Sequence, residues 1–371
     1  MASGTGSQRA PTAPQIAAFR LARHHLTSSK AADLAGVCRD VCGIQAQVMR
    51  AAQMSLWARL PRCTRAQIRA ALAEKRTLVK TASVRGTLHL LAAEDFPLFV
   101  AALRRSRMDA AMGIMARFGI TRAEADAMTE DVLEALSGGP LTNQELTSRI
   151  APKVGRKIRR WMGIVWNSHR PAIAQGLICY GPERGAEVTF VRADQWLPRQ
   201  KKFTEREAQQ ILIRRYLGAF GPATLRDFCH WCGIPSKDAR SVWESLRDEY
   251  VPIAAPGHDA VILRQDLPAL SKASRRSPVV RLLPNFDTYL LGHKEKGHLV
   301  EPRHYKLVFR AAGWVSPVLL VDGRVAGIWS LARRGQRASL DVQFFTKLAR
   351  PVADTLEEEK AALLDFLGSP G

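Results

Sequence analysis

Two glutamines, Gln45 and Gln47, lie two residues apart in the stretch Val41-Cys-Gly-Ile-Gln-Ala-Gln-Val48, shortly after a glycine. Each helical residue turns the chain by about 100°, so this spacing is a poor one for a single helix face. A shared task for the two amides therefore requires a loop or a helix start rather than a helix interior. From spacing alone, the simplest interpretation is a pair of surface amides at a helix N-terminus.

The composition is that of a folded, strongly basic protein. The chain has 371 residues, with 55 Lys and Arg against 34 Asp and Glu, and a formal net charge of +21. Its hydrophobic content of 46% excludes a disordered basic tail. Such a protein most often binds a polyanion, and nucleic acid is the first candidate. The alternative is a high-GC genome that favours Arg and Ala throughout.

The positive charge is concentrated in segments, as expected of a protein that neutralises several phosphates. The span between Glu145 and Glu183 holds no acidic residue, and further basic clusters lie at 199–202, 272–276 and 333–337. The cationic residues of that span are Arg149, Lys153, Arg156, Lys157, Arg159, Arg160 and Arg170.

The six cysteines, at positions 38, 42, 63, 179, 229 and 232, predict neither a metal site nor a redox pair. Cys229-His-Trp-Cys232 has a suggestive spacing, but a structural zinc needs four ligands and no second pair exists. These cysteines fit the apolar side of a short helix, so we predict that they pack in a core. The N-terminus has no apolar signal core, and no apolar run approaches the about 20 residues that span a bilayer. We therefore expect a reduced, cytoplasmic protein without metal or cofactor.

A weak internal repeat organises the chain. Three strand-like runs, at 90–97, 190–198 and 263–268, end in an Asp followed closely by an apolar residue and a proline. The second and third close segments in the order helix, helix, helix, hairpin, which is the order of a winged helix, and the first copy is longer, with four predicted helices before its strands. The predicted fold is α+β, with a flexible N-terminus (1–14), winged helices at 15–118, 119–201 and 202–275, and a C-terminal β-rich element with a terminal helix (276–371).

Periodicity and caps predict the individual elements. Thr142 and Glu145 have the spacing of a capping box, and Asp322-Gly323 centres a strong hairpin at 318–329. Helices are predicted near 16–24, 31–42, 46–59, 64–73, 125–136, 162–175, 208–217, 221–228, 235–246 and 354–367. Strands are predicted near 78–91, 177–180, 188–191, 251–253 and 260–263.

Two further groups of residues leave alternatives open. His89, after Arg85 at the end of the first predicted wing, is either a buried strand histidine or part of a nucleic-acid groove. Asp287 and Tyr289 are predicted on one face of a strand. Asp287 is either a structural acceptor or a residue that lines a site, and Tyr289 is a candidate for the same lining.

Five motifs occur together in the order found in one known family. They are Gln45-Ala-Gln47, Arg85-Gly-Thr-Leu-His-Leu-Leu91, Phe220-Gly-Pro-Ala-Thr-Leu-Arg-Asp-Phe228, Leu283-Pro-Asn-Phe-Asp-Thr-Tyr-Leu-Leu-Gly292 and Val321-Asp-Gly-Arg-Val-Ala-Gly327. The chain resembles the bacterial winged-helix DNA glycosylases of the AlkZ and YcaQ type, from about residue 15 to 350. Gln45-Ala46-Gln47 is similar to the family's catalytic motif in its AlkZ form, which ends in Gln rather than Asp.

The resemblance implies a C-shaped stack of three winged helices and a β-rich element around a basic channel for duplex DNA. It also implies removal of bulky N7-alkylguanines and unhooking of interstrand crosslinks, as self-resistance to a genotoxin. The expected partner is double-stranded DNA that carries alkylated guanine, and no membrane association is expected. The enzyme is expected to be a monomer associated with the nucleoid.

The chemistry of that substrate accounts for two uncharged residues. A guanine alkylated at N7 is already cationic and leaves without a general acid, through a transition state that is oxocarbenium-like at C1′. The remaining task is to hold a water molecule at C1′, which two amide oxygens can do. An amide cannot remove a proton as strongly as a carboxylate, so we expect restriction to cationic leaving groups. No lysine adjoins the motif, so we predict a monofunctional glycosylase that leaves an abasic site.

Two hypotheses follow for the whole chain. In the first, Gln45 and Gln47 are catalytic. The predicted DNA contacts are Arg50, Lys80, Arg85, His89, Arg333, Arg334 and Arg337. In the second, the chain is a non-catalytic winged-helix regulator or drug-responsive DNA binder, which usually requires a dimer on spaced half-sites. No dimerisation helix or heptad repeat is evident, which favours the first hypothesis.

Overall fold

The computed structural model describes residues 10–27, 31, 33–163, 169–198, 201–255, 258–275, 277–334 and 337–368. At 254, 255, 258, 259, 333, 334, 337 and 338 only the backbone is described. The fold is α+β, with two sheets, a separate hairpin and helices throughout. Short 3-10 turns lie between these elements at Val84–Gly86 (η1), Ala93–Asp95, Arg247–Glu249, Arg264–Asp266, Pro302–His304 and Ala311–Gly313.

The first segment places a short strand between two helices. Its elements are α1 (Ala13–Arg23), α2 (Leu34–Asp40), β1 (Ile44–Gln45), α3 (Met49–Arg59), α4 (Arg65–Ala73), β2 (Leu78–Ala82) and β3 (Leu88–Ala92). β3 pairs with both β1 and β2, in the order β1-β3-β2. The strand β1 is therefore held at the edge of the hairpin formed by β2 and β3.

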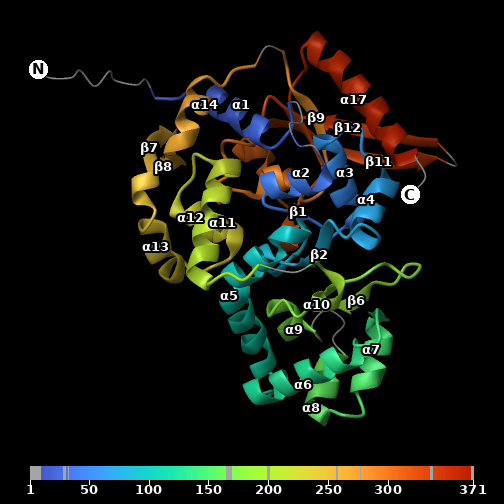
Figure 1. Ribbon diagram of the computed structural model, residues 1–371. Coiled ribbons are helices and arrows are strands. Elements are labelled where there is room, and N and C mark those ends of the chain that lie inside the picture. The colour runs from blue at the N-terminus through green and yellow to red at the C-terminus, as the bar shows by residue number, and fades with distance from the viewer. Residues whose placement is uncertain are drawn as a thin grey trace, which may run out of the picture.

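The second segment follows a long helix, α5 (Phe96–Ala116), and extends the same sheet. Lys80 of β2 pairs with Tyr180 of β5, which gives the six-strand order β1-β3-β2-β5-β6-β4. Figure 1 shows α6 to α9 as a lower lobe joined to the main body through α5. The elements are α6 (Arg122–Ala135), β4 (Leu141–Thr142), α7 (Asn143–Ile150), α8 (Arg156–Met162), α9 (Arg170–Ala174), β5 (Ile178–Tyr180), β6 (Thr189–Arg192) and α10 (Ala193–Trp196).

The third segment packs on α5 and ends in its own two-stranded hairpin. Its elements are α11 (Glu205–Phe220), α12 (Leu225–Cys232), α13 (Ser236–Glu244), β7 (Tyr250–Ala255), β8 (His258–Leu263) and α14 (Leu267–Ser271). Ala223 forms an isolated bridge to Val261 of β8. This bridge occupies the place that β1 and β4 have in the first two segments.

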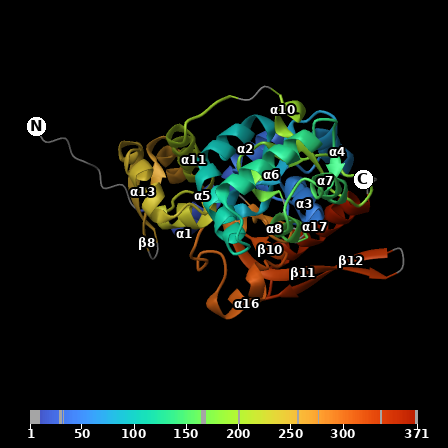
Figure 2. The same ribbon diagram turned by 90° about the horizontal axis from the view of Figure 1, so that it is seen from below.

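The C-terminal element is built on an antiparallel sheet in the order β12-β11-β10-β9. Figure 2 shows the long β11–β12 hairpin and α16 projecting from one side of the molecule. The elements are β9 (Val280–Leu283), α15 (Thr288–Leu291), α16 (Tyr305–Val308), β10 (Val318–Val321), β11 (Arg324–Arg334), β12 (Arg337–Phe344) and α17 (Arg350–Gly368).

The apolar cores do not follow the order of the segments along the chain. One core joins residues of the first segment, such as Leu56, to residues of the C-terminal element, such as Leu283. A second core joins α5 and the β2–β3 hairpin to the third segment. The second segment has a core of its own. The first segment therefore packs against the C-terminal element on one side and against the third segment on the other.

The structure corrects two of the predicted elements. The helix predicted around 162–175 is confirmed only over Arg170–Ala174 (α9), because α8 ends at Met162, and 164–168 lie outside the described residues. Asp287 is not on a strand: it is the N-cap of α15, and its side chain accepts the N–H of Tyr289. The predicted capping box is confirmed, since Thr142 accepts from the N–H of Glu145 and Glu145 from that of Thr142.

Candidate active site

The Gln45–Gln47 stretch lies between two helices, as its spacing requires. Gly43 has φ of +96°, a left-handed value that glycine adopts readily and that lets the chain leave the turn after α2. A Cβ at this position would lie 2.7 Å from Cδ2 of Leu91, so a larger residue would also clash with β3. Gln45 is the last residue of β1 and pairs with His89, and α3 begins only at Met49. Gln47 lies in the bend between β1 and α3, so both glutamines are outside a helix.

The two amide oxygens are held by different partners. Gln45 is buried, and its Oε1 accepts a hydrogen bond from Nη2 of Arg85 at 2.9 Å. Gln47 is exposed, and its Oε1 accepts from the main-chain N–H of Leu88 at 3.3 Å. Since an amide oxygen has two lone pairs, each can still accept from a water molecule. Both glutamines are therefore anchored to the turn and strand that follow β2.

A pocket of about 450 Å³ opens beside Gln47. Gln47 lines the pocket, whereas Gln45 does not line it but is hydrogen-bonded to Arg85, which does. Among the described residues that line the pocket there is no Asp, Glu, Lys or His. The lining residues are Gln47, Ala82, Arg85, Gly86, Leu88, Arg107, Ala110, Ala111, Arg170, Ile173, Ala174 and Tyr180. Three arginines and no carboxylate make the pocket suitable for an anionic group such as a phosphate.

Burial changes the acidity of several groups around this pocket. It lowers the pKa of Arg85 to about 10, with a smaller contribution from the neighbouring Arg107, so Arg85 remains charged at neutral pH. Desolvation also lowers the pKa of Arg107 and of Lys80. The Nζ of Lys80 lies 5.6 Å from the ring centroid of Tyr180, whose own pKa burial raises to about 12.

His89 is a buried histidine of strand β3. It is 3% exposed, and its Nδ1–H donates to the main-chain oxygen of Thr87, 2.9 Å away. Burial first, and then the charge of Arg85, lowers the pKa of His89 to about 3. This burial argues against the predicted DNA contact of His89, which stays a prediction.

We expect acid to destabilise the protein partly through His89. Between pH 6.5 and about 3 the unfolded imidazole binds a proton and the folded one does not, so folding stability falls as pH falls. The loss is about 1.4 kcal/mol per pH unit for such a histidine. Urea unfolding at pH 7 and pH 5 should show a smaller difference for His89→Gln than for the wild type. An equal difference would show that the buried imidazole accepts the proton where it lies.

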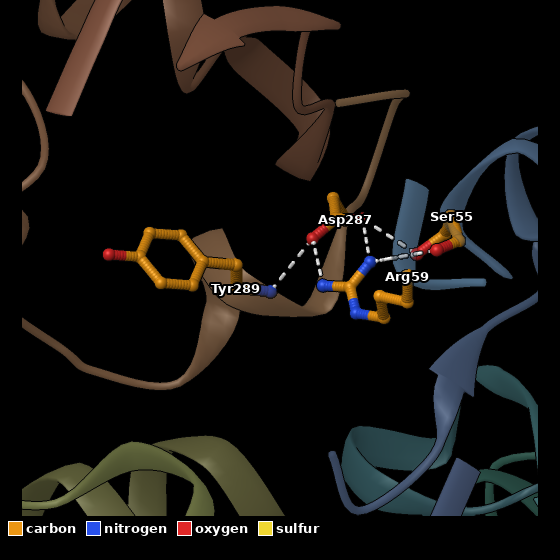
Figure 3. Close-up of polar contacts among 4 residues, drawn as sticks. All are labelled: Ser55, Arg59, Asp287 and Tyr289. Atoms are coloured by element: carbon orange, nitrogen blue, oxygen red, sulfur yellow. Dashed lines mark hydrogen bonds and ion pairs between the residues drawn. The ribbon is translucent and has the colours of Figure 1, made fainter. Parts of the chain in front are cut away.

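Asp287 is a structural acceptor and does not line the pocket. Figure 3 shows its carboxylate facing the guanidinium of Arg59, with Nη1 to Oδ2 at 2.8 Å and Nη2 to Oδ1 at 2.7 Å. The hydroxyl of Ser55 donates to Oδ2 at 2.6 Å, and the N–H of Tyr289 donates to Oδ1 at 3.0 Å. Arg59 and Asp287 both have fully buried side chains. This ion pair ties α3, which follows Gln47, to the C-terminal element.

Tyr289 lines a different cavity. It is 5% exposed, and its hydroxyl donates to the main-chain oxygen of Gly323 at 3.3 Å. It contributes to a pocket of about 700 Å³ that α1 and the C-terminal element share, together with Arg20 and His293. The prediction that Tyr289 lines a site thus applies to a cavity that Gln45 and Gln47 do not border.

The remaining predicted DNA contacts lie in several places. Arg50 is exposed in the first turn of α3, and Lys80 is half-buried on β2. Arg333, Arg334 and Arg337 are at the facing ends of β11 and β12, and their side chains lie outside what the structure describes. The guanidinium of Arg85 is bound within the protein.

Three pocket residues were missed by the prediction. Arg107 comes from α5, and Arg170 and Tyr180 come from the second segment. Arg170 belongs to the acid-free basic span, so the charge pattern carried a signal for it. Nothing in the sequence distinguishes Arg107 and Tyr180 from other arginines and strand aromatics.

The six cysteines are buried, free thiols, which confirms core packing for Cys229 and Cys232. In the described part of the chain, no cluster of three or more His, Cys, Asp or Glu could hold a metal ion. Over the same residues, no helix has the length and apolar character needed to cross a membrane.

A glutamine in an arginine-lined pocket, in a chain of net charge +21, is typical of a protein that binds a polyanion. Comparison with known proteins identifies which kind. The sequence profile described as "DNA glycosylase AlkZ-like" matches residues 38–366. The chain belongs to the AlkZ-like DNA glycosylase family, and it is a DNA glycosylase.

A named protein and a solved structure, both from Streptomyces sahachiroi, show how far the similarity extends. The chain is 33% identical over 328 residues to a protein named "Interstrand DNA cross-link repair glycosylase", covering 85% of this chain and 87% of the relative. The solved structure of "Streptomyces sahachiroi DNA glycosylase AlkZ" matches with a TM-score of 0.85 at 28% identity. That match covers 96% of this chain and 97% of the other.

Proposed function

We propose that this enzyme is a monofunctional glycosylase that hydrolyses the N-glycosidic bond of bulky, cationic N7-alkylguanines in duplex DNA. The observation that carries the proposal is an arginine-lined pocket with Gln47 in its wall, no carboxylate among its lining residues, and Gln45 hydrogen-bonded to Arg85 of the same wall. Membership of a DNA glycosylase family favours this function over a non-catalytic regulator.

The roles of the residues follow from the leaving group. The alkylated guanine leaves as a neutral base, and positive charge develops at C1′ of the sugar. Gln45 and Gln47 hold a water molecule through their oxygens, which limits catalysis to positioning and charge stabilisation. Arg107 and Arg170 bind the phosphates that flank the lesion, and the negative charge of these phosphates compensates the positive charge of the two arginines.

The proposed architecture is three winged helices and a β-rich element arranged as a C around a basic DNA channel. The first two segments support this, because each contains a helix, a short strand, further helices and a hairpin whose last strand pairs with the short one. In the third segment, the Ala223–Val261 bridge replaces the short strand. The proposed boundaries remain 15–118, 119–201, 202–275 and 276–371.

We extend the proposal to the unhooking of interstrand crosslinks, as self-resistance to a DNA-alkylating compound made by the host. The relative whose name refers to interstrand crosslink repair supports it. A gene position inside a biosynthetic cluster for such a compound would support self-resistance. A monomeric state and a cytoplasmic, nucleoid-associated location belong to the same proposal.

The test of the proposed reaction compares leaving groups in one duplex. We expect release of an N7-alkylguanine, and at least about 10²-fold slower release of uracil or 8-oxoguanine at the same position, because amides do not assist a poor leaving group. The product strand should carry an alkali-labile abasic site and remain uncut before alkali. Base release is measured by chromatography and strand cutting on denaturing gels.

Two results would contradict this proposal. One is release of the uncharged bases at a similar rate. The other is a covalent enzyme–DNA complex trapped by borohydride, which would reveal an imine and hence a lyase step.

A further inference from the structure

Arg85 occupies a backbone conformation that is unusual for its type. It lies in η1 between β2 and β3, with φ of +56°, and Gly86 follows with φ of +71°. The left-handed region costs a non-glycine residue about 1–2 kcal/mol. A side chain that remains in such a turn is expected to make contacts that offset this cost. For Arg85 these contacts lie inside the protein.

The guanidinium of Arg85 bridges two parts of the chain that are far apart in sequence. Its Nη2 donates to Oε1 of Gln45 at 2.9 Å, and its Nη1 donates to the main-chain oxygen of Trp231 at 2.8 Å. Trp231 is the penultimate residue of α12, in the third segment. One planar group with a fixed fork of donors thus joins Gln45 to the end of a helix.

The C-terminus of α12 is shaped to receive this arginine. The last carbonyls of a helix lack internal partners and carry a partial negative charge, which favours cations. Arg85 binds the oxygen of Trp231, and Nη2 of Arg107 binds the oxygen of Cys232 at 2.7 Å. Gly233 ends the helix, and a Cβ there would lie 3.3 Å from Cα of Arg85 and 2.7 Å from Nη2 of Arg107. A side chain there would have to displace the Arg107 guanidinium, and the φ of +78° at Gly233 would strain any other residue.

The contact fixes which way the Gln45 amide faces. An arginine has donors only, so it can donate to the oxygen of the amide but cannot pair with its NH2 group. Without this partner, a rotation of half a turn would exchange the two ends at little energetic difference. With it, Oε1 has one lone pair occupied and its position fixed, and the second lone pair remains for a water molecule.

We propose that Arg85 is the positioning residue of Gln45, and that the docking of α12 on the β2–β3 turn holds Arg85 in place. This inference rests on the proposed role of Gln45 in orienting water. Arg85 then acts on catalysis without touching DNA, in contrast to the phosphate contact predicted from the sequence. The third segment, although it contributes no wall to the Gln47 pocket, determines the geometry of the site.

The test is a double-mutant cycle on single-turnover excision of an N7-alkylguanine from duplex DNA, at saturating enzyme. Arg85→Ala is expected to slow excision about 10- to 100-fold, the size expected for a misplaced catalytic group. In a Gln45→Ala background, Arg85→Ala should slow it by less than about 2-fold, because the residue acts through an amide already absent. The affinity for DNA and its salt dependence should stay those of the wild type.

Arg107→Ala is the matched control. It removes the neighbouring arginine from the same helix end but breaks no contact with Gln45. In the Arg107→Ala, Gln45→Ala double variant, the reduction in rate should therefore equal the product of the reductions in the two single variants. If Arg85→Ala does not fold, the cycle is repeated with Arg85→Lys, which keeps the charge but lacks the fork needed to bridge both oxygens.

The outcomes distinguish the positioning role of Arg85 from the proposed catalytic role of Gln45. If Gln45→Ala and Arg85→Ala each slow excision and their effects multiply, the positioning role is wrong and the proposed function stands. If Arg85→Ala weakens DNA binding, lowers the salt slope by about 1 and leaves the saturated rate unchanged, Arg85 contacts a phosphate and the inference is overturned. If Gln45→Ala alone excises at the wild-type rate, the proposed role of Gln45 falls, and the inference with it.

Discussion

The Gln45→Ala, Gln47→Ala double variant is expected to excise an N7-alkylguanine at least about 10²-fold more slowly than the wild type, as for loss of a group that activates or positions the nucleophile. Gln47 lines the pocket, and Gln45 is hydrogen-bonded to Arg85, which lines it too. The cationic base still leaves readily, so a slow residual reaction should persist. The measurement is the single-turnover rate on a duplex with one defined adduct.

The two single variants separate chemistry from folding. Gln47→Ala frees only the N–H of Leu88 near the surface, where water can replace the lost acceptor. Gln45→Ala removes a buried acceptor of Arg85 and is expected to lower stability by about 1–3 kcal/mol as well. Gln195→Ala, at an exposed glutamine of α10, is the control for both. Wild-type excision by the double variant would refute the assignment of either amide.

Local patterns in the sequence predicted most elements of the fold. The helices of the third segment and the Asp322-Gly323 hairpin lie close to their predicted positions, because caps, periodicity and turn residues are local signals. The long helix α5 was missed, since its buried residues face two different cores and leave little amphipathic period. The union of the first two hairpins in one sheet depends on the Lys80–Tyr180 pairing, for which the sequence carries no signal.

In the candidate site, too, contacts between distant parts of the chain could not be predicted from local patterns. Gln45 and Gln47 were predicted from a resemblance, and the break at Gly43 from the spacing of the two amides. Their hydrogen-bond partners could not be predicted. Arg85 reaches Gln45 because it lies in a left-handed turn and is bound to Trp231 at the end of a helix, 146 residues further along the chain. Asp287 is conspicuous in the sequence because it is a carboxylate within an apolar motif. Its role could still not be predicted, because its partner Arg59 belongs to another segment.

Asp287→Ala is expected to lower the free energy of unfolding by about 3–5 kcal/mol, because it leaves the guanidinium of Arg59 buried without a counter-charge. Replacing both partners, as in Arg59→Met with Asp287→Leu, should recover much of this loss, since no charge then remains buried. Urea unfolding monitored by tryptophan fluorescence measures both. If the ion pair serves only to hold α3 on the C-terminal element, excision per folded molecule should change by no more than a few-fold in the single variant. A variant of full stability that has lost excision would instead place Asp287 in the chemistry.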